Sequence, residues 1–174
     1  MHMLIFCSRF VGFSGSEAVY GLLRSVYISK YGDDFPVIKK TPNGKPYFPD
    51  RPDVHFSLSH TKTHVLCAIS DMPVGCDIEA NSREISQRGR SFFCTPEELS
   101  MFEALDLWVL KESYIKLFGL SFADLRRQKF LRKGDEIILP DPNVSAKIYS
   151  VDGLKIGLCS FSADFPDFIE VVTV

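Results

Sequence analysis

The segment that most constrains the fold spans residues 74–79 and reads Val-Gly-Cys-Asp-Ile-Glu. Its apolar positions are typical of a β-strand, in which successive side chains point to opposite faces of the sheet. Asp77 and Glu79 therefore point the same way, with Cα atoms about 6.5–7 Å apart. Two ionised carboxylates at that spacing repel each other unless a positive group lies between them. The segment is either part of a divalent-metal site, since hard cations prefer oxygen ligands, or an edge strand with an acidic solvent face.

A helix is predicted over residues 107–119, where Gly119 ends it as a C-terminal cap. Trp108, Glu112 and Lys116 are spaced four residues apart and so share one face of this helix. A surface Glu–Lys pair would explain the two charges, and it would stabilise the helix by only about 0.2–0.5 kcal/mol. That explanation leaves out the tryptophan. The alternative is that an aromatic ring, a carboxylate and an ammonium on one face complete a metal–phosphate site.

Two further motifs precede these segments: Gly-Lys-Pro at residues 44–46 and His-Phe-Ser-Leu-Ser-His at residues 55–60. The predicted helix carries the fourth, Trp-x-x-Lys-Glu-Ser-x-x-Lys, at residues 108–116. In this order and spacing, the four motifs resemble the signature of the 4′-phosphopantetheinyl transferases, the larger type that activates surfactin synthetase. The resemblance covers roughly residues 20–120 and is looser toward the C-terminus.

The resemblance implies an α+β fold with two pseudo-symmetric lobes, each made of helices packed on a small antiparallel sheet. We expect a shortened N-terminal lobe at residues 1–73 and a C-terminal lobe with the metal site at residues 74–174. Coenzyme A would bind in the cleft between the lobes. Because the chain supplies two internal lobes and no low-complexity linker, we expect the lobes to share one core and the protein to be a monomer.

The implied activity is transfer of the 4′-phosphopantetheine group of coenzyme A to a serine of an apo acyl or peptidyl carrier protein. The products would be the holo carrier protein and 3′,5′-ADP, as in fatty acid, polyketide or nonribosomal peptide biosynthesis. Two rival interpretations stay open: a non-catalytic relative that binds coenzyme A or a carrier domain, and a metal-dependent phosphohydrolase.

The resemblance assigns Asp77, Glu79 and Glu112 as ligands of Mg²⁺, with Mn²⁺ as a possible substitute. Two adjacent phosphates need a divalent ion to neutralise charge and to fix geometry. We expect Glu112 to accept the serine proton, directly or through a metal-bound water, and Lys116 to stabilise charge on the phosphate oxygens. Asp77, Glu112 and Lys116 are therefore the expected catalytic residues.

The same resemblance supplies a set of residues that contact coenzyme A. Lys45 would lie beside the nucleotide end, while Ser59 and His60 would contact the phosphates. From the residues alone, Lys45 could be an ordinary solvated lysine after a hairpin turn, and His60 a histidine at a strand end without a functional role. The complete expected set is Lys45, Pro46, Ser59, His60, Lys111 and Lys116.

The chain departs from the family pattern in three places. Only about ten residues precede the first predicted helix, and a basic segment usual there is missing. An arginine that commonly grips the nucleotide phosphate appears as Gly15 or a neighbour. The stretches between Thr95 and Trp108 and after Gly119 are also short. These departures affect what can be expected of the affinity for coenzyme A and of the choice of carrier protein. The three expected metal ligands are all present.

Composition excludes several other classes of protein. The chain has 174 residues, 45% of them hydrophobic, and a net charge of −2, which indicates a globular domain without a basic excess for nucleic acid. No apolar run is long enough to span a membrane, and the N-terminus lacks the features of a signal peptide. Five scattered cysteines form no Cys-x-x-Cys pair, so we expect reduced thiols in a cytoplasmic protein.

Local signals predict the elements around these motifs. A capping box at residues 14–17 begins a helix that Gly32 ends, another helix is expected over residues 82–93, and a capping box at residues 95–98 begins the next. Hairpin turns are predicted at Asn43-Gly44 and Asp152-Gly153. Strands are expected at residues 4–10, 37–40, 46–48, 54–58, 65–70, 137–139, 145–151, 155–161 and 169–174.

Overall fold

The first strand and the last strand of the chain lie side by side in one sheet. A computed structural model describes residues 3–12, 14–32 and 34–172. In it, β1 (Leu4–Arg9) pairs in parallel with β11 (Glu170–Val171) and antiparallel with β5 (His64–Ser70), which pairs in turn with β4 (His55–His60). The C-terminal end of the chain thus completes the sheet that the N-terminal end begins.

A second sheet has the order β6-β10-β9 and is antiparallel throughout. Its strands are β6 (Val74–Ala80), β10 (Leu154–Ser160) and β9 (Ser145–Val151). Two small hairpins are formed by β2 (Lys39–Lys40) with β3 (Pro46–Tyr47) and by β7 (Leu131–Lys133) with β8 (Glu136–Ile138). The helical elements are α1 (Gly15–Tyr31), α2 (Gln87–Phe93), α3 (Pro96–Leu99), α4 (Ala104–Phe118) and the 3₁₀ helix η1 (Phe122–Arg127).

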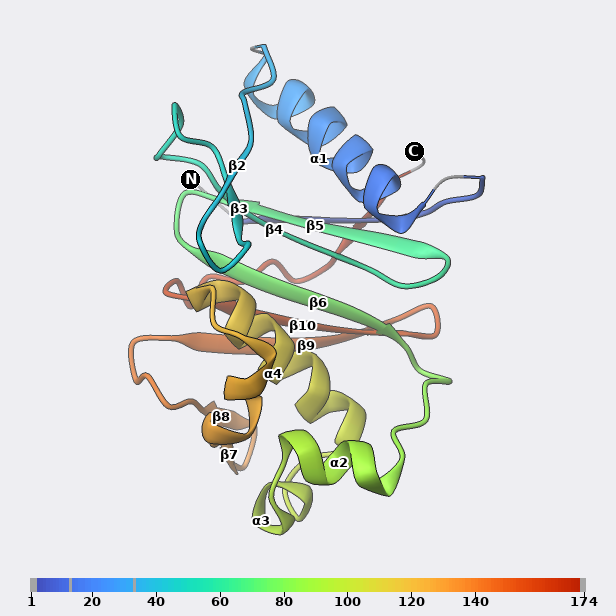
Figure 1. The fold of residues 1–174 in the computed structure, drawn as a ribbon, viewed down its shortest axis with the longest axis vertical. Coiled ribbons are helices and arrows are strands. Elements are labelled where there is room, and N and C mark those ends of the chain that lie inside the picture. The colour runs from blue at the N-terminus through green and yellow to red at the C-terminus, as the bar shows by residue number, and fades with distance from the viewer. Residues whose placement is uncertain (1–2, 13, 33, 173–174) are drawn as a thin grey trace.

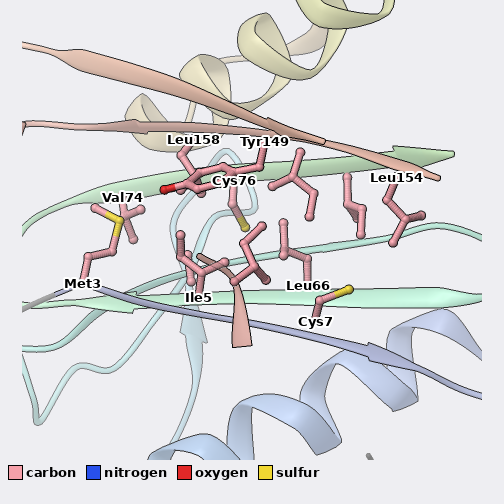
Figure 2. Close-up of a cluster of buried hydrophobic side chains, with 13 residues drawn as sticks. Met3, Ile5, Cys7, Leu66, Val74, Cys76, Tyr149, Leu154 and Leu158 are labelled. Carbon is pink, nitrogen blue, oxygen red and sulfur yellow. The ribbon is translucent and has the colours of Figure 1, made fainter. Parts of the chain in front are cut away.

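The two larger sheets face each other, and each has a long helix on its outer side (Figure 1). Side chains from β1 and β5 meet side chains from β6 and β10 in the central core, among them Ile5, Leu66, Cys76 and Leu158 (Figure 2). The buried face of α1, which includes Leu22 and Val26, packs on the other face of the first sheet. Helix α4 packs on the outer face of the second sheet, so the order of layers is helix, sheet, sheet, helix.

Several local predictions are confirmed. Ser14 Oγ accepts a hydrogen bond from the Glu17 backbone N–H, and the Glu17 carboxylate accepts one from the Ser14 backbone N–H, so the predicted capping box begins α1. Gly32 ends that helix and Gly119 ends α4, both in the left-handed conformation that glycine adopts without a steric penalty. The turn between β9 and β10 has positive φ at Asp152 and Gly153, as its sequence predicts.

Other predicted boundaries were wrong. The helix expected over residues 82–93 covers only Gln87–Phe93, because Ser86 acts as its N-cap by accepting a hydrogen bond from the Gly89 N–H. The strand expected at residues 169–174 is formed only by Glu170–Val171, and residues 173–174 lie outside the described part of the chain. The strand β7 was not predicted. Within the described residues, no helix is both long and apolar enough to span a membrane.

Candidate active site

Two glycines allow α4 to approach the second sheet closely. A Cβ atom at Gly75 on β6 would overlap the carbonyl oxygen of Ser113, and one at Gly157 on β10 would overlap that of Val109. The helix backbone therefore lies directly on the two strands. Because Gly75 is two residues from Asp77, this packing brings the polar face of α4 to the end of β6 that carries the acidic pair.

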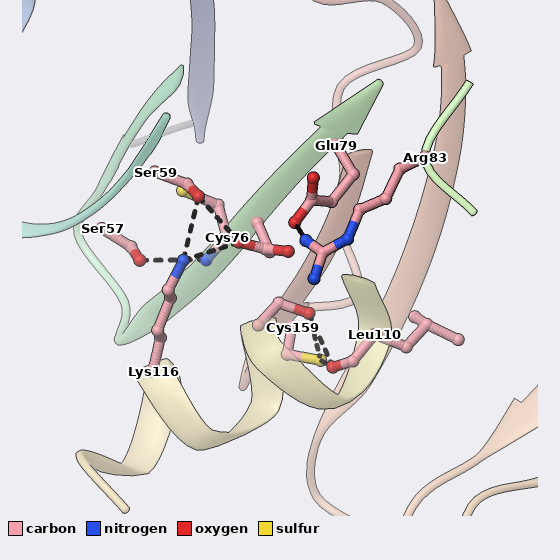
Figure 3. Close-up of polar contacts among 10 residues, drawn as sticks. Ser57, Ser59, Cys76, Glu79, Arg83, Leu110, Lys116 and Cys159 are labelled. Atoms are coloured by element: carbon pink, nitrogen blue, oxygen red, sulfur yellow. Dashed lines mark hydrogen bonds and ion pairs between the residues drawn. The ribbon is translucent and has the colours of Figure 1, made fainter. Parts of the chain in front are cut away.

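A polar cluster joins α4 to the facing edges of both sheets. Lys116 Nζ donates hydrogen bonds to Asp77 Oδ1 at 2.7 Å and to Ser59 Oγ at 3.0 Å, and Ser59 donates to Asp77 Oδ1 at 2.7 Å (Figure 3). Two residues before Ser59 on β4, Ser57 Oγ accepts a hydrogen bond of 2.9 Å from the backbone N–H of Cys76, the residue before Asp77 on β6. Side chains thus connect β4 to β6.

Asp77 is nearly fully buried, yet its second carboxylate oxygen is not used. Within the described residues, Oδ2 of Asp77 has no hydrogen-bond partner. A buried acceptor without a partner costs free energy, so such an atom points to a ligand. Burial lowers the pKa of Lys116, but the charges of Asp77, Cys76 and Glu112 more than offset this effect, so its pKa lies above the usual value.

Glu112 lies one helical turn before Lys116, and 8% of the residue is exposed. Burial and, after it, the negative charge of Asp77 raise the pKa of Glu112 to about 7, against the opposite effects of Lys116 and Arg83. Two carboxylates, Asp77 and Glu112, are therefore close enough to repel each other. Burial next to a like charge is the arrangement that keeps a carboxyl group ready to exchange a proton near neutral pH.

Glu79 is placed differently from these two carboxylates. Its Oε1 atom forms an ion pair with Arg83, four residues along the chain, and the Arg83 guanidinium lies 4.5 Å from the centre of the Trp108 ring. Over residues 3–12, 14–32 and 34–172, no three His, Cys, Asp or Glu side chains are gathered in a way that could hold a metal ion. The structure brings Asp77 and Glu112 together, while Arg83 holds the third expected ligand.

Two pockets meet at His60. The first has a volume of about 280 Å³ and is lined by residues expected to contact coenzyme A, namely Lys45, Pro46, Ser59, His60 and Lys116. The second, of about 790 Å³, lies between the β4–β5 turn and the loop after β6, and its lining includes His60, Glu79 and Arg83. Predicted residues of all four motifs therefore line these two pockets, and two of them, Ser59 and Lys116, contact Asp77.

Lys45 has two roles in this arrangement. It lines the smaller pocket, and its Nζ atom donates a hydrogen bond of 2.5 Å to the carbonyl oxygen of Leu117. Asn43 donates a further hydrogen bond, of 2.9 Å, to the carbonyl oxygen of Gly119. Both carbonyls belong to the C-terminal end of α4, which lacks partners within the helix and favours a cation. Burial lowers the pKa of Lys45 to about 8.

Lys111 lies outside both pockets. Its side chain is fully buried and forms a 2.7 Å ion pair with Glu98 and a 2.7 Å hydrogen bond to the Phe93 carbonyl oxygen. Glu98 also accepts a hydrogen bond from the Phe130 backbone N–H. Because no atom of the Lys111 side chain is exposed, the expectation that it contacts coenzyme A does not agree with this placement. The pair instead ties α2 and α3 to α4.

Sequence reasoning missed two neighbours of the site. Arg83 was not singled out, although its spacing of four residues from Glu79 is a weak signal for an ion pair. Gly15, noted only as a departure from the family pattern, lies against the ring of His60, and a Cβ atom at this position would overlap the ring. A small residue at position 15 is therefore needed for His60 to take this position.

Comparison with known proteins places these motifs in a family. The family model of the 4′-phosphopantetheinyl transferase superfamily matches residues 73–146, which include Asp77, Glu79, Glu112 and Lys116. The chain is also 34% identical over 170 residues to 4′-phosphopantetheinyl transferase Sfp of Bacillus subtilis (strain 168), covering 87% of this chain and 76% of that protein. The chain belongs to the 4′-phosphopantetheinyl transferase family.

Other members of the family match over shorter stretches. A second 4′-phosphopantetheinyl transferase of Bacillus subtilis is 33% identical over 147 residues, and the match covers 75% of this chain and 65% of that protein. The enzyme gsp of Aneurinibacillus migulanus is 34% identical over 121 residues, which cover 59% of this chain and 49% of that protein. The phosphopantetheinyl transferase described here thus spans between half and three quarters of these relatives, and the expected α+β fold of the family is confirmed.

Proposed function

We propose that this phosphopantetheinyl transferase moves the 4′-phosphopantetheine group of coenzyme A to a serine of an apo acyl or peptidyl carrier protein, with the help of Mg²⁺. The observation that carries the proposal is the buried, partner-free Oδ2 of Asp77 beside Glu112 and Lys116, next to two adjoining pockets. Family membership supplies the reaction, and this cluster supplies a place for it. Because Asp77, Glu112 and Lys116 are all present, a catalytic protein is favoured over a relative that only binds coenzyme A.

The oxygen donors at the site suit Mg²⁺, and Mn²⁺ as a substitute. Asp77 Oδ2 and the Glu112 carboxylate are the proposed ligands, and Glu79 becomes the third if Arg83 releases it. Hard cations of this type prefer carboxylate oxygens and keep several positions for phosphate and water. When bound, the ion neutralises the pyrophosphate and favours departure of its leaving group.

The protein side chains divide the remaining tasks. Lys45 and Pro46 contact the nucleotide end of coenzyme A, while Ser59 and His60 hold its phosphates. Glu112, whose pKa of about 7 suits a general base, takes the proton of the carrier serine. A bond then forms between the serine oxygen and the phosphorus of the phosphopantetheine group, and the bond to the other phosphate breaks.

The leaving group of this displacement is 3′,5′-ADP, and Lys116 faces the negative charge that develops on the phosphate oxygens. Lys116 suits this task because its ammonium is already held in place by Asp77 and Ser59. A pre-positioned charge of this kind stabilises the transition state without reorganising during the reaction.

We further propose that residues 1–73 and 74–174 act as two lobes around this site and that the protein is a cytoplasmic monomer. Support for the location comes from the cysteines, since Cys7, Cys67, Cys76, Cys94 and Cys159 are all buried and unpaired. Support for two lobes comes from the two sheets, each with its own long helix, while β11 of residues 74–174 adds to the first sheet and joins the lobes.

The proposal is tested by the intact mass of a purified apo carrier protein after incubation with the transferase, coenzyme A and Mg²⁺. A gain of one phosphopantetheine group supports it, and Asp77→Asn serves as the inactive control. Removal of metal with a chelator is expected to abolish the gain, and Mg²⁺ or Mn²⁺ to restore it. Turnover that survives chelation, or that only Zn²⁺ restores, would contradict the proposed carboxylate site. Hydrolysis of coenzyme A without modification of any carrier would support a phosphohydrolase instead.

A further inference from the structure

Arg83 lies where three functional elements meet. It follows β6, and its backbone N–H donates a 2.9 Å hydrogen bond to the Ala80 carbonyl oxygen, which turns the chain back toward Glu79. The neighbouring Asn81 N–H donates to the Gly153 carbonyl oxygen at 2.8 Å and fixes the loop to the β9–β10 hairpin. This turn directs the guanidinium of Arg83 onto the Glu79 carboxylate (Figure 3).

The guanidinium carries positive charge to the place where the proposed function needs a divalent ion. It pairs with Glu79, one of the three carboxylates expected to bind that ion. An arginine stays charged at every physiological pH, so it cannot leave Glu79 by losing a proton. The pair can open only if one of the two side chains moves.

The surroundings of the Arg83–Glu79 pair allow it to open. The Arg83 side chain is 39% exposed, and that of Glu79 is 17% exposed. On its other contact, the guanidinium lies over the ring of Trp108, and a cation on an aromatic face is stabilised without a partner carboxylate. Trp108 can therefore retain the guanidinium when Glu79 turns away from it.

We propose that Arg83 is a positioning residue that holds Glu79 while no metal is bound and competes with the divalent ion for that carboxylate. The inference rests on the proposed function, because the ion is part of it. Asp77 and Glu112 then set most of the affinity for the ion, and Glu79 joins them only when the ion displaces Arg83. Arg83 thus lowers the affinity of the free protein for the metal.

The first test measures metal binding without turnover. Mn²⁺ alone is titrated into the metal-free protein, and unbound Mn²⁺ is followed by electron paramagnetic resonance. Because partly exposed ion pairs contribute up to about 1 kcal/mol, Arg83→Gln is expected to bind Mn²⁺ up to roughly fivefold more tightly than the unmutated protein. Arg83→Lys, which keeps the charge, is expected to return most of the way to the original affinity.

Two controls separate the pair from a general charge effect. Arg88→Gln removes the same charge from an exposed position on α2 and is expected to leave Mn²⁺ affinity unchanged. Adding Glu79→Gln to Arg83→Gln is expected to cancel the gain, because the released carboxylate is then gone. A gain that persists in this double variant, or that appears equally in Arg88→Gln, overturns the proposal.

The second test uses Trp108, the single tryptophan of the chain, as a fluorescent probe of Arg83. Mg²⁺ is expected to change its emission in the unmutated protein and to change it far less in Arg83→Gln. If Mg²⁺ changes the Trp108 emission equally in the unmutated protein and in Arg83→Gln, and both bind Mn²⁺ with equal affinity, the proposed role of Arg83 is overturned. The proposed metal-dependent modification of a carrier protein is not affected by that result. Absence of Mn²⁺ binding in every variant overturns this inference together with the metal part of the proposed function.

Discussion

Lys116 Nζ lies 2.7 Å from Asp77 Oδ1, so a residue of α4 neutralises a carboxylate on the edge strand of the second sheet. Its 3.0 Å hydrogen bond to Ser59 Oγ reaches the edge strand of the first sheet as well. The site is therefore also a joint between the two sheets. A variant that disturbs the chemistry here should disturb stability too, and the two effects can be measured separately.

Lys116→Met removes the ammonium and leaves the buried Asp77 carboxylate without its partner. Removing one partner of a fully buried pair costs roughly 3–5 kcal/mol, and a smaller loss is expected here because the Lys116 side chain is 30% exposed. Turnover should fall strongly as well. In urea unfolding, the double variant Asp77→Asn/Lys116→Met is expected to be more stable than Lys116→Met alone. Strict additivity of the two substitutions would show that the pair contributes nothing to folding.

Glu112→Gln is expected to slow turnover and to stabilise the metal-free protein. Turnover should fall by the roughly 10²–10⁴-fold typical of a lost general base. Because the pKa of Glu112 is raised from 4.5 to about 7 in the folded protein, its favourable contribution is complete below pH 4.5 and is lost as the pH rises to about 7. Gln does not ionise, so the variant should be more stable at pH 8 by up to about 3 kcal/mol, and not at pH 4.

Urea unfolding of metal-free Glu112→Gln at the two pH values checks the stability, and the carrier mass assay checks turnover. A variant that is less stable than the unmutated protein at pH 8 would show that Glu112 is held as a favourable carboxylate. Near-normal turnover would remove Glu112 from the mechanism and leave its proximity to Lys116 on α4 as a matter of stability alone.

His60→Ala is expected to raise KM for coenzyme A and to leave kcat nearly unchanged. His60 lies at the junction of the two pockets, where it would contact a phosphate that is present both before and during the reaction. Loss of such uniform binding affects KM alone. His64→Ala, at the other end of the same turn and outside both pockets, is the matched control for steady-state kinetics. A large fall in kcat at constant KM would give His60 a direct part in the chemistry.

The predictions that succeeded rest on residues close together in the chain. The capping box at Ser14 and the turn at Asp152-Gly153 each depend on a few neighbouring residues, so the sequence alone determines them. The helix expected from residue 82 begins later for a related local reason, since Ser86 acts as the N-cap and fixes the start of α2 at Gln87.

Contacts between distant residues were harder to predict. Lysines are almost never fully buried unless they are paired, and the partner of Lys111 is Glu98 on the four-residue helix α3. No residue near Lys111 in the sequence indicates that Glu98 is its partner. The acidic strand was predicted to point both carboxylates one way, but it could not reveal that Arg83 takes one of them. Motifs identified the residues of the site, whereas tertiary contacts decide which ones are free to act.

The last prediction concerns the close packing of α4 on the second sheet. Gly75→Ala introduces a Cβ atom onto the Ser113 carbonyl oxygen, so the helix must move outward. Such overpacking typically costs about 1–3 kcal/mol. The movement would also shift Glu112 and Lys116 relative to Asp77, and a displacement of about 1 Å at a reacting group can cost 10²-fold in rate.

Gly89→Ala on α2 is the matched control for this substitution. Its Cβ atom meets only side-chain atoms, of Ile85 at 3.2 Å and of Ser86 at 3.4 Å, and alanine favours a helix by about 1 kcal/mol over glycine. Urea unfolding should therefore show a loss of stability for Gly75→Ala and little change or a gain for Gly89→Ala, with a fall in turnover only for the first. If Gly75→Ala kept both stability and turnover, α4 would have room to move, and the placement of its polar face would not depend on the contact at Gly75.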